Sequence, residues 1–531
     1  MKTRVLSLVI AAVMLFSVLT LASCGKKSFN YAKEDLSAYI TLTEKDYRNV
    51  PVSIATGITA ANVYAEISTA ISELSDEKLA SIAKTDRAVA ENDIAAIYYR
   101  GVTADAEGKE TGFEGGTNLG DVNPTWLYIG SDAFIEGFED ALIGKLPTDS
   151  SITEITEGKV AEDDLVVLEI AGMYGEKEPY LVYDNLAVKL DETTILPQSV
   201  IDKLVGATIG EELIFDIDMD ADGDKEEENV VFAAKVFRKL DVKAEKITVK
   251  FPSDYQDSAL AGKEAFFYVV VESVVTPDVA TVEALGYAAG DDAVAALKAG
   301  AEKALVNDYI ANLKGEDHED HEGHNHEENF ANTVKVAIWS EISGKDYDVT
   351  YPANTVESYI KTEKNNLNYA YNAGADAESI QSTYKTLDDY AAYVYGDEDW
   401  ESVIEKDAKD FVKRKLVFYT IAKTLGVNEA TKAEKSEVKA ELETAYVDYY
   451  TQMYTIYNAI GGWGYTTEQI KTLAQNEAKA VVDSMTDTYI SEAVIKEKIL
   501  DKLYEGYDVD SLVTWTTSVA DAEDASDKDA E

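Results

Sequence analysis

An acidic run between residues 218 and 226 has the residue types and spacing of a calcium-binding loop. Carboxylates alternate along it and a glycine permits a tight turn, in the order Asp218, Asp220, Asp222, Gly223, Asp224, Glu226. Calcium prefers such oxygen ligands. Position twelve of an EF-hand loop would be Asn229 rather than glutamate, and the flanking residues have the pattern of strands. Two interpretations remain: weak structural binding of Ca²⁺, or an acidic β-hairpin tip.

All four histidines of the chain lie in one short acidic stretch, at His318, His321, His324 and His326. Imidazoles clustered with carboxylates suit zinc, nickel or copper. The density of charge and the glycines at 315 and 323 are equally typical of a disordered loop. We expect opportunistic, weak binding of a transition metal here and no structural or catalytic metal site.

The only cysteine, Cys24, follows an N-terminal segment that has the pattern of an export signal. Lys2 and Arg4 precede an apolar run from residue 5 to 22, and Leu-Ala-Ser-Cys at 21–24 resembles a bacterial lipobox. We expect residues 1–23 to be a signal peptide and Cys24 to be acylated. The alternative, an uncleaved membrane helix, leaves this lone cysteine unexplained. The expected location is the outer face of the bacterial cytoplasmic membrane, with Cys24 as the lipid anchor.

The net charge of the chain excludes one class of binding partner. A formal net charge of −52 over 531 residues repels nucleic acid, so we expect no nucleic-acid partner. The same charge favours a well-solvated surface that collects divalent cations. The length allows two to four domains.

One stretch, from Trp126 to Gly144, is central to the predicted order of strands and helices. It opens as a strand over 126–129 and turns at Gly130. A helix is then expected, because Phe134, Ile135, Phe138 and Leu142 recur at three- and four-residue steps and so share one face.

The amino-acid sequence of this stretch resembles that of a known family. Gly-Ser-x-x-Phe-Ile-x-Gly-Phe-Glu at 130–139 is similar to the central segment of FKBP-type peptidyl-prolyl cis-trans isomerases, in the form found in trigger factor. Further family landmarks follow in order at 90–101, 113–116, 247–255 and 261–271. The resemblance implies an FKBP-like antiparallel β-sheet around a short helix, over residues 87–275.

The resemblance also implies a proline-binding pocket, whose residues would be Tyr99, Phe113, Glu114, Phe134, Ile135, Phe138, Tyr255 and Phe267. An X-Pro bond rotates over a barrier of roughly 18–20 kcal/mol because rotation breaks amide resonance. An apolar site favours the twisted transition state, which has lost charge separation, so no cofactor is required. Glu114 and the hydroxyls of Tyr99 and Tyr255 would orient the peptide, and an N–H near Ile135 would bind its carbonyl. Thr125 departs from the family, whose small members keep an aromatic residue there.

Residues 147–245 interrupt the family order and resemble a degenerate copy of the surrounding domain. Aligning 87–101 with 158–172 matches five residues, among them Asp93 with Asp164 and Gly101 with Gly172. Ile170 and Val200 stand where the pocket has Tyr99 and Phe138. We therefore expect an inserted FKBP-like domain without isomerase activity.

The rest of the chain divides into three segments that differ in composition and in expected secondary structure. Residues 24–86 are expected to form a tether and a small α/β segment, with a helix over 60–82. Residues 276–517, with no proline after Pro352, are expected to form long helices that resemble the trigger-factor chaperone domain. Capping boxes at Thr431 and Thr466 mark two helix starts. A stripe of tyrosines over 446–457 indicates either core or an adaptable surface. Residues 518–531 are an acidic tail, expected to be disordered.

Together these patterns predict an α+β, membrane-tethered, extracytoplasmic foldase. It would be a peptidyl-prolyl cis-trans isomerase with chaperone activity on unfolded or nascent exported polypeptides that contain X-Pro bonds. No ribosome contact is expected, because the basic docking loop of trigger factor is absent from the sequence. The alternative is a non-catalytic holdase or a cation-binding surface lipoprotein.

Overall fold

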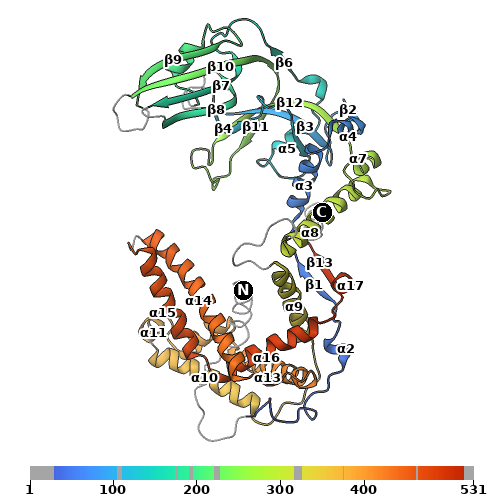
Figure 1. The fold of residues 1–531 in the computed structure, drawn as a ribbon, viewed down its shortest axis with the longest axis vertical. Coiled ribbons are helices and arrows are strands. Elements are labelled where there is room, and N and C mark those ends of the chain that lie inside the picture. The colour runs from blue at the N-terminus through green and yellow to red at the C-terminus, as the bar shows by residue number, and fades with distance from the viewer. Residues whose placement is uncertain are drawn as a thin grey trace. The chain divides into compact units, whose positions relative to one another are not determined.

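The computed structural model describes residues 29–519 apart from 105–109, 175–177, 191–194, 221–227, 316–325, 375 and 462–463. The chain forms two compact units (Figure 1). The helical unit comprises Met1–Thr56 and Asp308–Thr516, and the sheet unit comprises Gly57–Asn307 and Thr517–Glu531. The sheets and long helices confirm the predicted α+β class.

The sheet unit contains a six-stranded antiparallel sheet, here called the host sheet. Its main order is β11-β12-β3-β4, while β2 pairs with β12 and β5 with β3. The strand bounds are β2 Lys84–Thr85, β3 Ile94–Ala104, β4 Glu110–Thr117, β5 Thr125–Tyr128, β11 Glu245–Lys250 and β12 Glu264–Val275. The landmarks at 90–101, 247–255 and 261–271 contain residues of β3, β11 and β12, although β11 ends at Lys250.

Both faces of the host sheet are covered, and β3 shows how. Ala95 and Ile97 belong to a core with the short helix α5 (Phe138–Leu142) on one face. Ile94 and Ala96 belong to a second core on the other face. That second core is closed by α3 (Ala60–Ser72), by α7 (Val279–Ala284) and by the first half of α8 (Ala293–Lys314). The alternation follows from the period of two along a strand.

The N-terminal segment differs from its prediction in two ways. The expected helix over 60–82 is two helices, because Ser75 takes an extended backbone conformation before α4 (Asp76–Ser81). The expected small domain over 24–86 is divided between the units. Residues 29–56 pack in the helical unit, whereas α3 packs against the host sheet.

Residues 151–243 form a separate five-stranded sheet, here called the insert sheet. Its order is β6-β10-β7-β8, with β9 also on β10, and a helix α6 (Gln198–Leu204) closes its own core. The strand bounds are β6 Ser151–Ile155, β7 Leu165–Tyr174, β8 Glu178–Lys189, β9 Glu212–Met219 and β10 Glu228–Lys243, and a short 3₁₀ helix η1 (Pro147–Asp149) precedes them.

The host sheet and the insert sheet share the same turn before their strands β3 and β7. The Ala90 N–H donates to the Asp93 carboxylate at 2.8 Å, and the Ala161 N–H donates to the Asp164 carboxylate at 2.7 Å. The residue before each aspartate has a positive φ, 63° at Asn92 and 66° at Asp163. The residues matched in the sequence thus occupy equivalent positions.

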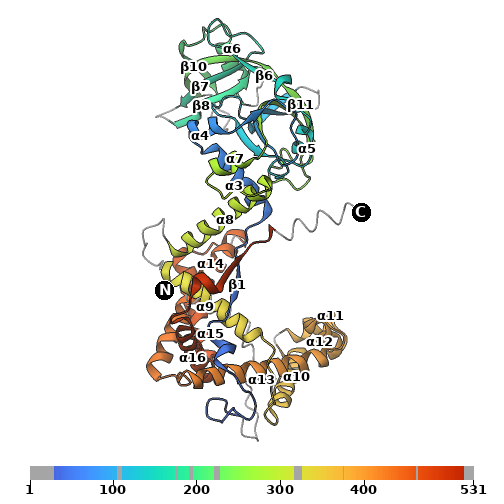
Figure 2. The ribbon, with the colours of Figure 1, turned by 90° about the vertical axis from the view of Figure 1, so that its right-hand side faces the viewer.

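The insert sheet contacts the host sheet on the face opposite to α5. Tyr98 of β3 points to this face and packs in a cluster with Leu119, Val167 and Leu240. The Gly120 carbonyl accepts a hydrogen bond from Arg238 Nη2 at 3.0 Å. Figure 2 shows α5 beside β11.

The helical unit is built from long helices, as expected. Its elements are α2 Glu44–Tyr47, β1 Val52–Ala55, α9 His326–Gly344, α10 Thr355–Ala373, α11 Ala377–Thr383, α12 Leu387–Tyr395, α13 Trp400–Thr424, α14 Lys432–Gly461, α15 Thr467–Ser484, α16 Asp487–Tyr504, α17 Val509–Leu512 and β13 Val513–Thr516. α14 and α15 run side by side (Figure 1). Both predicted capping boxes form: Glu434 N–H donates to Thr431 Oγ1, and Gln469 N–H donates to Thr466 Oγ1.

One strand pair in this unit was not predicted. β1 and β13 pair in parallel, with Val52 opposite Val513 and Ala55 opposite Thr516. Helix had been expected almost to the end of the chain, whereas α17 ends at Leu512 and strand follows directly.

Within the described part of the chain, no helix combines the length and apolar character that crossing a membrane would require.

Candidate aromatic binding site

The loop before α5 is shaped by one buried carboxylate. Glu139, only 6% exposed, accepts hydrogen bonds from the N–H groups of Gly130 and Ser131 at 2.8 Å each and of Ala133 at 2.9 Å. A carboxylate that gathers several backbone donors fixes a loop strongly. The loop therefore presents Phe134 and Ile135 in one defined conformation.

The predicted helix over this stretch is shorter than expected. α5 begins only at Phe138, so Phe134 and Ile135 lie in the loop. Asp132 and Gly137 have φ values of 54° and 85°, which a right-handed helix cannot accommodate. The apolar residues still come together, but through a folded loop rather than a helix face.

Five rings, from β3, β4, α5, β12 and the loop before α5, form one cluster, here called the aromatic cup: Tyr99, Phe113, Phe134, Phe138 and Phe267. Phe134 stacks on Phe138 with ring centroids 4.4 Å apart. Phe267 meets Phe138 edge-on at 5.1 Å, and Phe113 at 6.0 Å. Tyr99 meets Phe134 edge-on at 5.4 Å. Such edge-to-face and offset arrangements are the favoured aromatic geometries.

The burial of the aromatic cup is graded. Phe138 and Phe267 are 0% and 4% exposed, whereas Tyr99, Phe113, Phe134 and Ile135 are partly exposed. The first two form a floor and the others form accessible walls. The Ile135 N–H makes no hydrogen bond among the described residues, and its carbonyl accepts from Phe138 at 3.0 Å.

Two glycines allow the rings to approach the host sheet. A Cβ at Gly101 would lie 2.6 Å from Phe113 Cζ and 2.7 Å from Phe267 Cε1. A Cβ at Gly116 would lie 2.7 Å from Phe113 Cε2. Any larger residue would displace these rings. Both glycines lie in the family landmarks at 90–101 and 113–116, but this packing role was not predicted.

A buried amide holds Tyr99 in place. Asn118 Oδ1 accepts from the Tyr99 N–H at 2.6 Å, and Asn118 Nδ2 donates to the Thr125 hydroxyl at 2.9 Å. Thr125, which departs from the family pattern, therefore serves this network on the same side of the host sheet as Leu127. Burial, and then the charge of Asp121, raise the pKa of Tyr99, so its hydroxyl stays protonated at neutral pH.

The remaining predicted pocket residues are placed differently. Tyr255 is 40% exposed and packs on Phe251 at 4.7 Å, and Phe251 in turn meets Phe113 at 5.7 Å. Phe251 lies within the landmark at 247–255 and was not predicted as a pocket residue, yet it links Tyr255 to the aromatic cup. Glu114 lies on β4, and its side chain is outside the described residues.

The insert sheet has a different surface at the equivalent place. Ile170 and Val200 are 1% and 0% exposed and fill the core. Phe232 nevertheless packs over Gly172, where a Cβ would lie 2.5 Å from its ring, as Phe267 packs over Gly101. Phe215 stacks on Phe232 at 5.4 Å. Tyr180 also meets Phe232 edge-on at 6.1 Å, as Phe113 meets Phe267. The strand arrangement and part of the ring packing therefore repeat, whereas Tyr99 and Phe138 are replaced by aliphatic residues.

The predicted metal ligands are largely outside the described residues: Asp222, Asp224, Glu226, His318, His321 and His324. Asp218 lies on β9, where its carboxylate accepts from Asn229 Nδ2 at 3.0 Å, and Asp220 follows it. His326 begins α9. Within the described residues no group of three potential metal ligands is found. Cys24, the predicted lipid site, is also outside them.

The fold and site define an α+β protein with an accessible aromatic cup on an antiparallel sheet. No protein-family model matches the chain, and no curated protein matches it. Among solved structures, one match is a trigger factor chaperone, described for promiscuous substrate recognition in its folding and assembly activities. Identity is 16%, the match covers 68% of this chain and 65% of that chain, and the TM-score is 0.19. A similarity this low carries no argument about the fold or the function.

Proposed function

We propose that the chain is an exported, membrane-tethered foldase whose FKBP-like host domain binds X-Pro segments and catalyses their cis-trans isomerisation. The observation that carries the proposal is the graded aromatic cup, with a buried floor of Phe138 and Phe267 and accessible walls. The resemblance of residues 87–146 and 246–275 to FKBP-type isomerases supports the same assignment.

Each part of the site has a role in this chemistry. The floor and walls hold a pyrrolidine ring and exclude water, which favours the twisted amide over the planar, better-hydrated one. The Ile135 N–H, which makes no hydrogen bond within the described part of the chain, is available to the carbonyl that precedes proline. The protonated Tyr99 hydroxyl can donate to the peptide. No proton transfer, nucleophile or metal is needed, because only rotation about one bond occurs.

A chaperone activity of the helical unit is a separate part of the proposal. On α14, Tyr449 is 51% exposed, Ile456 is 55% exposed and Tyr457 is 48% exposed. Tyr446, in contrast, packs against a core between α14, α15 and α16. The tyrosine stripe thus divides into a buried and an exposed part. The exposed part supports contact with unfolded polypeptides, and also supports the alternative of a holdase without catalysis.

The test is a variant series on the full chain, with a proline tetrapeptide and with an aggregating unfolded protein. Phe138→Ala should abolish isomerisation, but it also removes a floor ring at a cost of about 3–5 kcal/mol. Tyr99→Phe keeps the ring and should lower the rate modestly without change in circular dichroism. Val200→Ala, in the insert core, should leave the rate unchanged. Loss of the rate in Val200→Ala alone, with Tyr99→Phe and Phe138→Ala unaffected, would contradict the assignment.

A further inference from the structure

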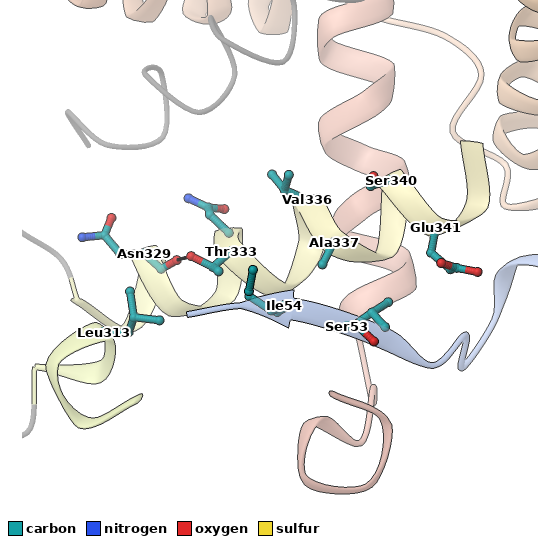
Figure 3. A pocket seen from close by; sticks show the side chains of 12 residues that line it. Ser53, Ile54, Leu313, Asn329, Thr333, Val336, Ala337, Ser340 and Glu341 are labelled. Carbon is teal, nitrogen blue, oxygen red and sulfur yellow. Dashed lines mark hydrogen bonds between the residues drawn. The ribbon is translucent and has the colours of Figure 1, made fainter. Parts of the chain in front are cut away.

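Strand β1 has one paired edge and one edge that borders a groove (Figure 3). β13 pairs with the first edge. The groove has a volume of about 630 Å³, within the roughly 300–1,000 Å³ that is usual for ligand sites. It is lined by all four residues of β1, by Leu313 and by one flank of α9, and Figure 3 shows β1 lying along α9.

The hydrogen bonds to β13 determine which backbone groups face the groove. The Thr56 N–H donates to the Thr516 carbonyl at 2.9 Å. Backbone groups of successive strand residues point to alternate edges, so those of Ile54 also point to β13. Those of Ser53 and Ala55 therefore point to the other edge. In the described part of the chain, no strand pairs with that edge.

The alternation of backbone direction extends to Pro51, the residue before the strand. Pro51 lies two residues before Ser53 and has no N–H to offer to the second edge. The unpaired N–H donors of this edge are thus those of Ser53 and Ala55, whose side chains are exposed. An unpaired strand edge is a template for another extended chain.

The lining of the groove suits an amide-rich ligand. The flank of α9 carries uncharged polar side chains, among them Asn329, Thr333 and Ser340. Asn332 Nδ2 is buried and has no hydrogen-bond partner among the described residues. A buried donor without an acceptor destabilises the protein. Asn332 also lines the groove, so rotation of its side chain would let a peptide carbonyl supply that acceptor.

The charge of the groove indicates which side chains a ligand would carry. Glu341 is the charged residue of its lining. Together with the net charge of −52, it favours an occupant that carries a basic residue. Val336, which is 39% exposed, and Ala337 favour small apolar side chains elsewhere along it.

We propose that the groove between β1 and α9 binds an extended, basic segment of an unfolded polypeptide, which adds to β1 as a third strand through the backbone of Ser53 and Ala55. Main-chain hydrogen bonds give such strand addition its affinity, and side-chain pockets give it selectivity. The site is separate from the aromatic cup and does not rest on its isomerase assignment.

The test measures binding of a fluorescein-labelled peptide, Lys-Thr-Val-Thr-Val-Thr-Lys, to the full chain by fluorescence anisotropy. The same peptide N-methylated at every internal residue is the ligand control, because it keeps the side chains and loses the donors. We expect the N-methylated peptide to bind at least tenfold more weakly. Equal binding of the two peptides, or no binding of the first at millimolar concentration, would overturn the proposal.

The protein variants give an independent arm. Ala55→Pro removes the outward N–H and leaves the bonds to β13, since proline is tolerated on a free strand edge. Its affinity for the unmethylated peptide should fall at least tenfold, while Ala55→Ser should stay within twofold of the parent. Parent-like affinity in a folded Ala55→Pro variant would overturn the proposal. Light scattering tests whether a second copy of the chain occupies the groove. If the parent is a dimer that Ala55→Pro dissociates while peptide binding is unchanged, the occupant is a second copy and the proposal is overturned.

Discussion

At the scale of single residues, Gly101 controls how closely the aromatic cup approaches the host sheet. The rings of Phe113 and Phe267 occupy the space that a side chain at position 101 would need. Sequence comparison could mark this glycine as a matched landmark, but only the backbone contacts explain it. Glu139 is a similar case: its position was quoted in a motif, while its role in holding the 130–134 loop depends on folded geometry.

Gly101→Ala should therefore distort the aromatic cup. Its Cβ would press on two rings, and overpacking of this kind costs about 1–3 kcal/mol. Gly172→Ala is the matched control, because its Cβ would press on Phe232 in the insert. Both variants should unfold at lower temperature in calorimetry, but only Gly101→Ala should weaken binding of a proline peptide. Equal loss of binding in both would contradict the separate roles of the two domains.

At the scale of elements, α13 and α16 are joined by buried polar groups. Glu492 of α16 pairs with Lys415 of α13, and it accepts a hydrogen bond from the Tyr419 hydroxyl at 2.9 Å. Burial lowers the pKa of Lys415, and the charge of Glu492 opposes this shift. Long helices were predicted over residues 276–517, but this pairing could not be predicted, because the two residues belong to different helices.

Lys496, also on α16, makes the stability of the helical unit depend on pH. Burial lowers the pKa of its amine to about 8, below roughly 10.4 in the unfolded chain. Between these values the unfolded chain binds more protons, so stability rises with pH. At pH 7 the buried charge costs up to about 3 kcal/mol.

Lys496→Met should accordingly raise the free energy of unfolding by about 1–3 kcal/mol at pH 7, and this gain should shrink toward zero above about pH 10. Urea unfolding followed by circular dichroism at both pH values measures it. Lys479→Met, at a lysine that is 64% exposed on α15, is the control and should show no such gain. A gain at pH 7 that persists unchanged at pH 10 would show that the cause is packing rather than charge.

The elements also show where sequence information is sufficient. Capping boxes at Thr431 and Thr466 predicted helix starts correctly, because a capping box is a local hydrogen-bond pattern. The helix expected through Phe134 and Ile135 was wrong, because the left-handed backbone at Asp132 and Gly137 outweighs the apolar spacing. Periodicity identified the residues that gather around Phe138 and misjudged the backbone that brings them there.

At the scale of the whole molecule, segments far apart in the sequence pair with each other, and no local sequence pattern predicts which ones. β1 and β13 pair although Thr56 and Thr516 are 460 residues apart. The division into units also follows tertiary packing, since α3 joins the host sheet while residues 29–56 join the helices. A pairing over this distance depends on which surfaces meet, and single-sequence patterns carry no such information.

The proposed attachment to the membrane belongs to the same scale. Cys24→Ala should remove the acylation site and release the protein into the soluble fraction of its native host. Fractionation followed by immunoblotting measures this, and a membrane wash with high salt separates lipid anchoring from electrostatic adsorption. Retention of the Cys24→Ala protein in salt-washed membranes would contradict the lipid anchor.

The central claim is that the aromatic cup catalyses rotation about X-Pro bonds. The most direct measurement is cis-trans exchange of a short proline peptide by NMR exchange spectroscopy, with the full chain at substoichiometric concentration. Uncatalysed exchange takes tens to hundreds of seconds. We predict exchange within the sub-second window of the experiment, abolished when a competing proline ligand saturates the cup. Exchange that stays at the uncatalysed rate, while the peptide is seen to bind, would contradict the claim and leave a proline-binding holdase.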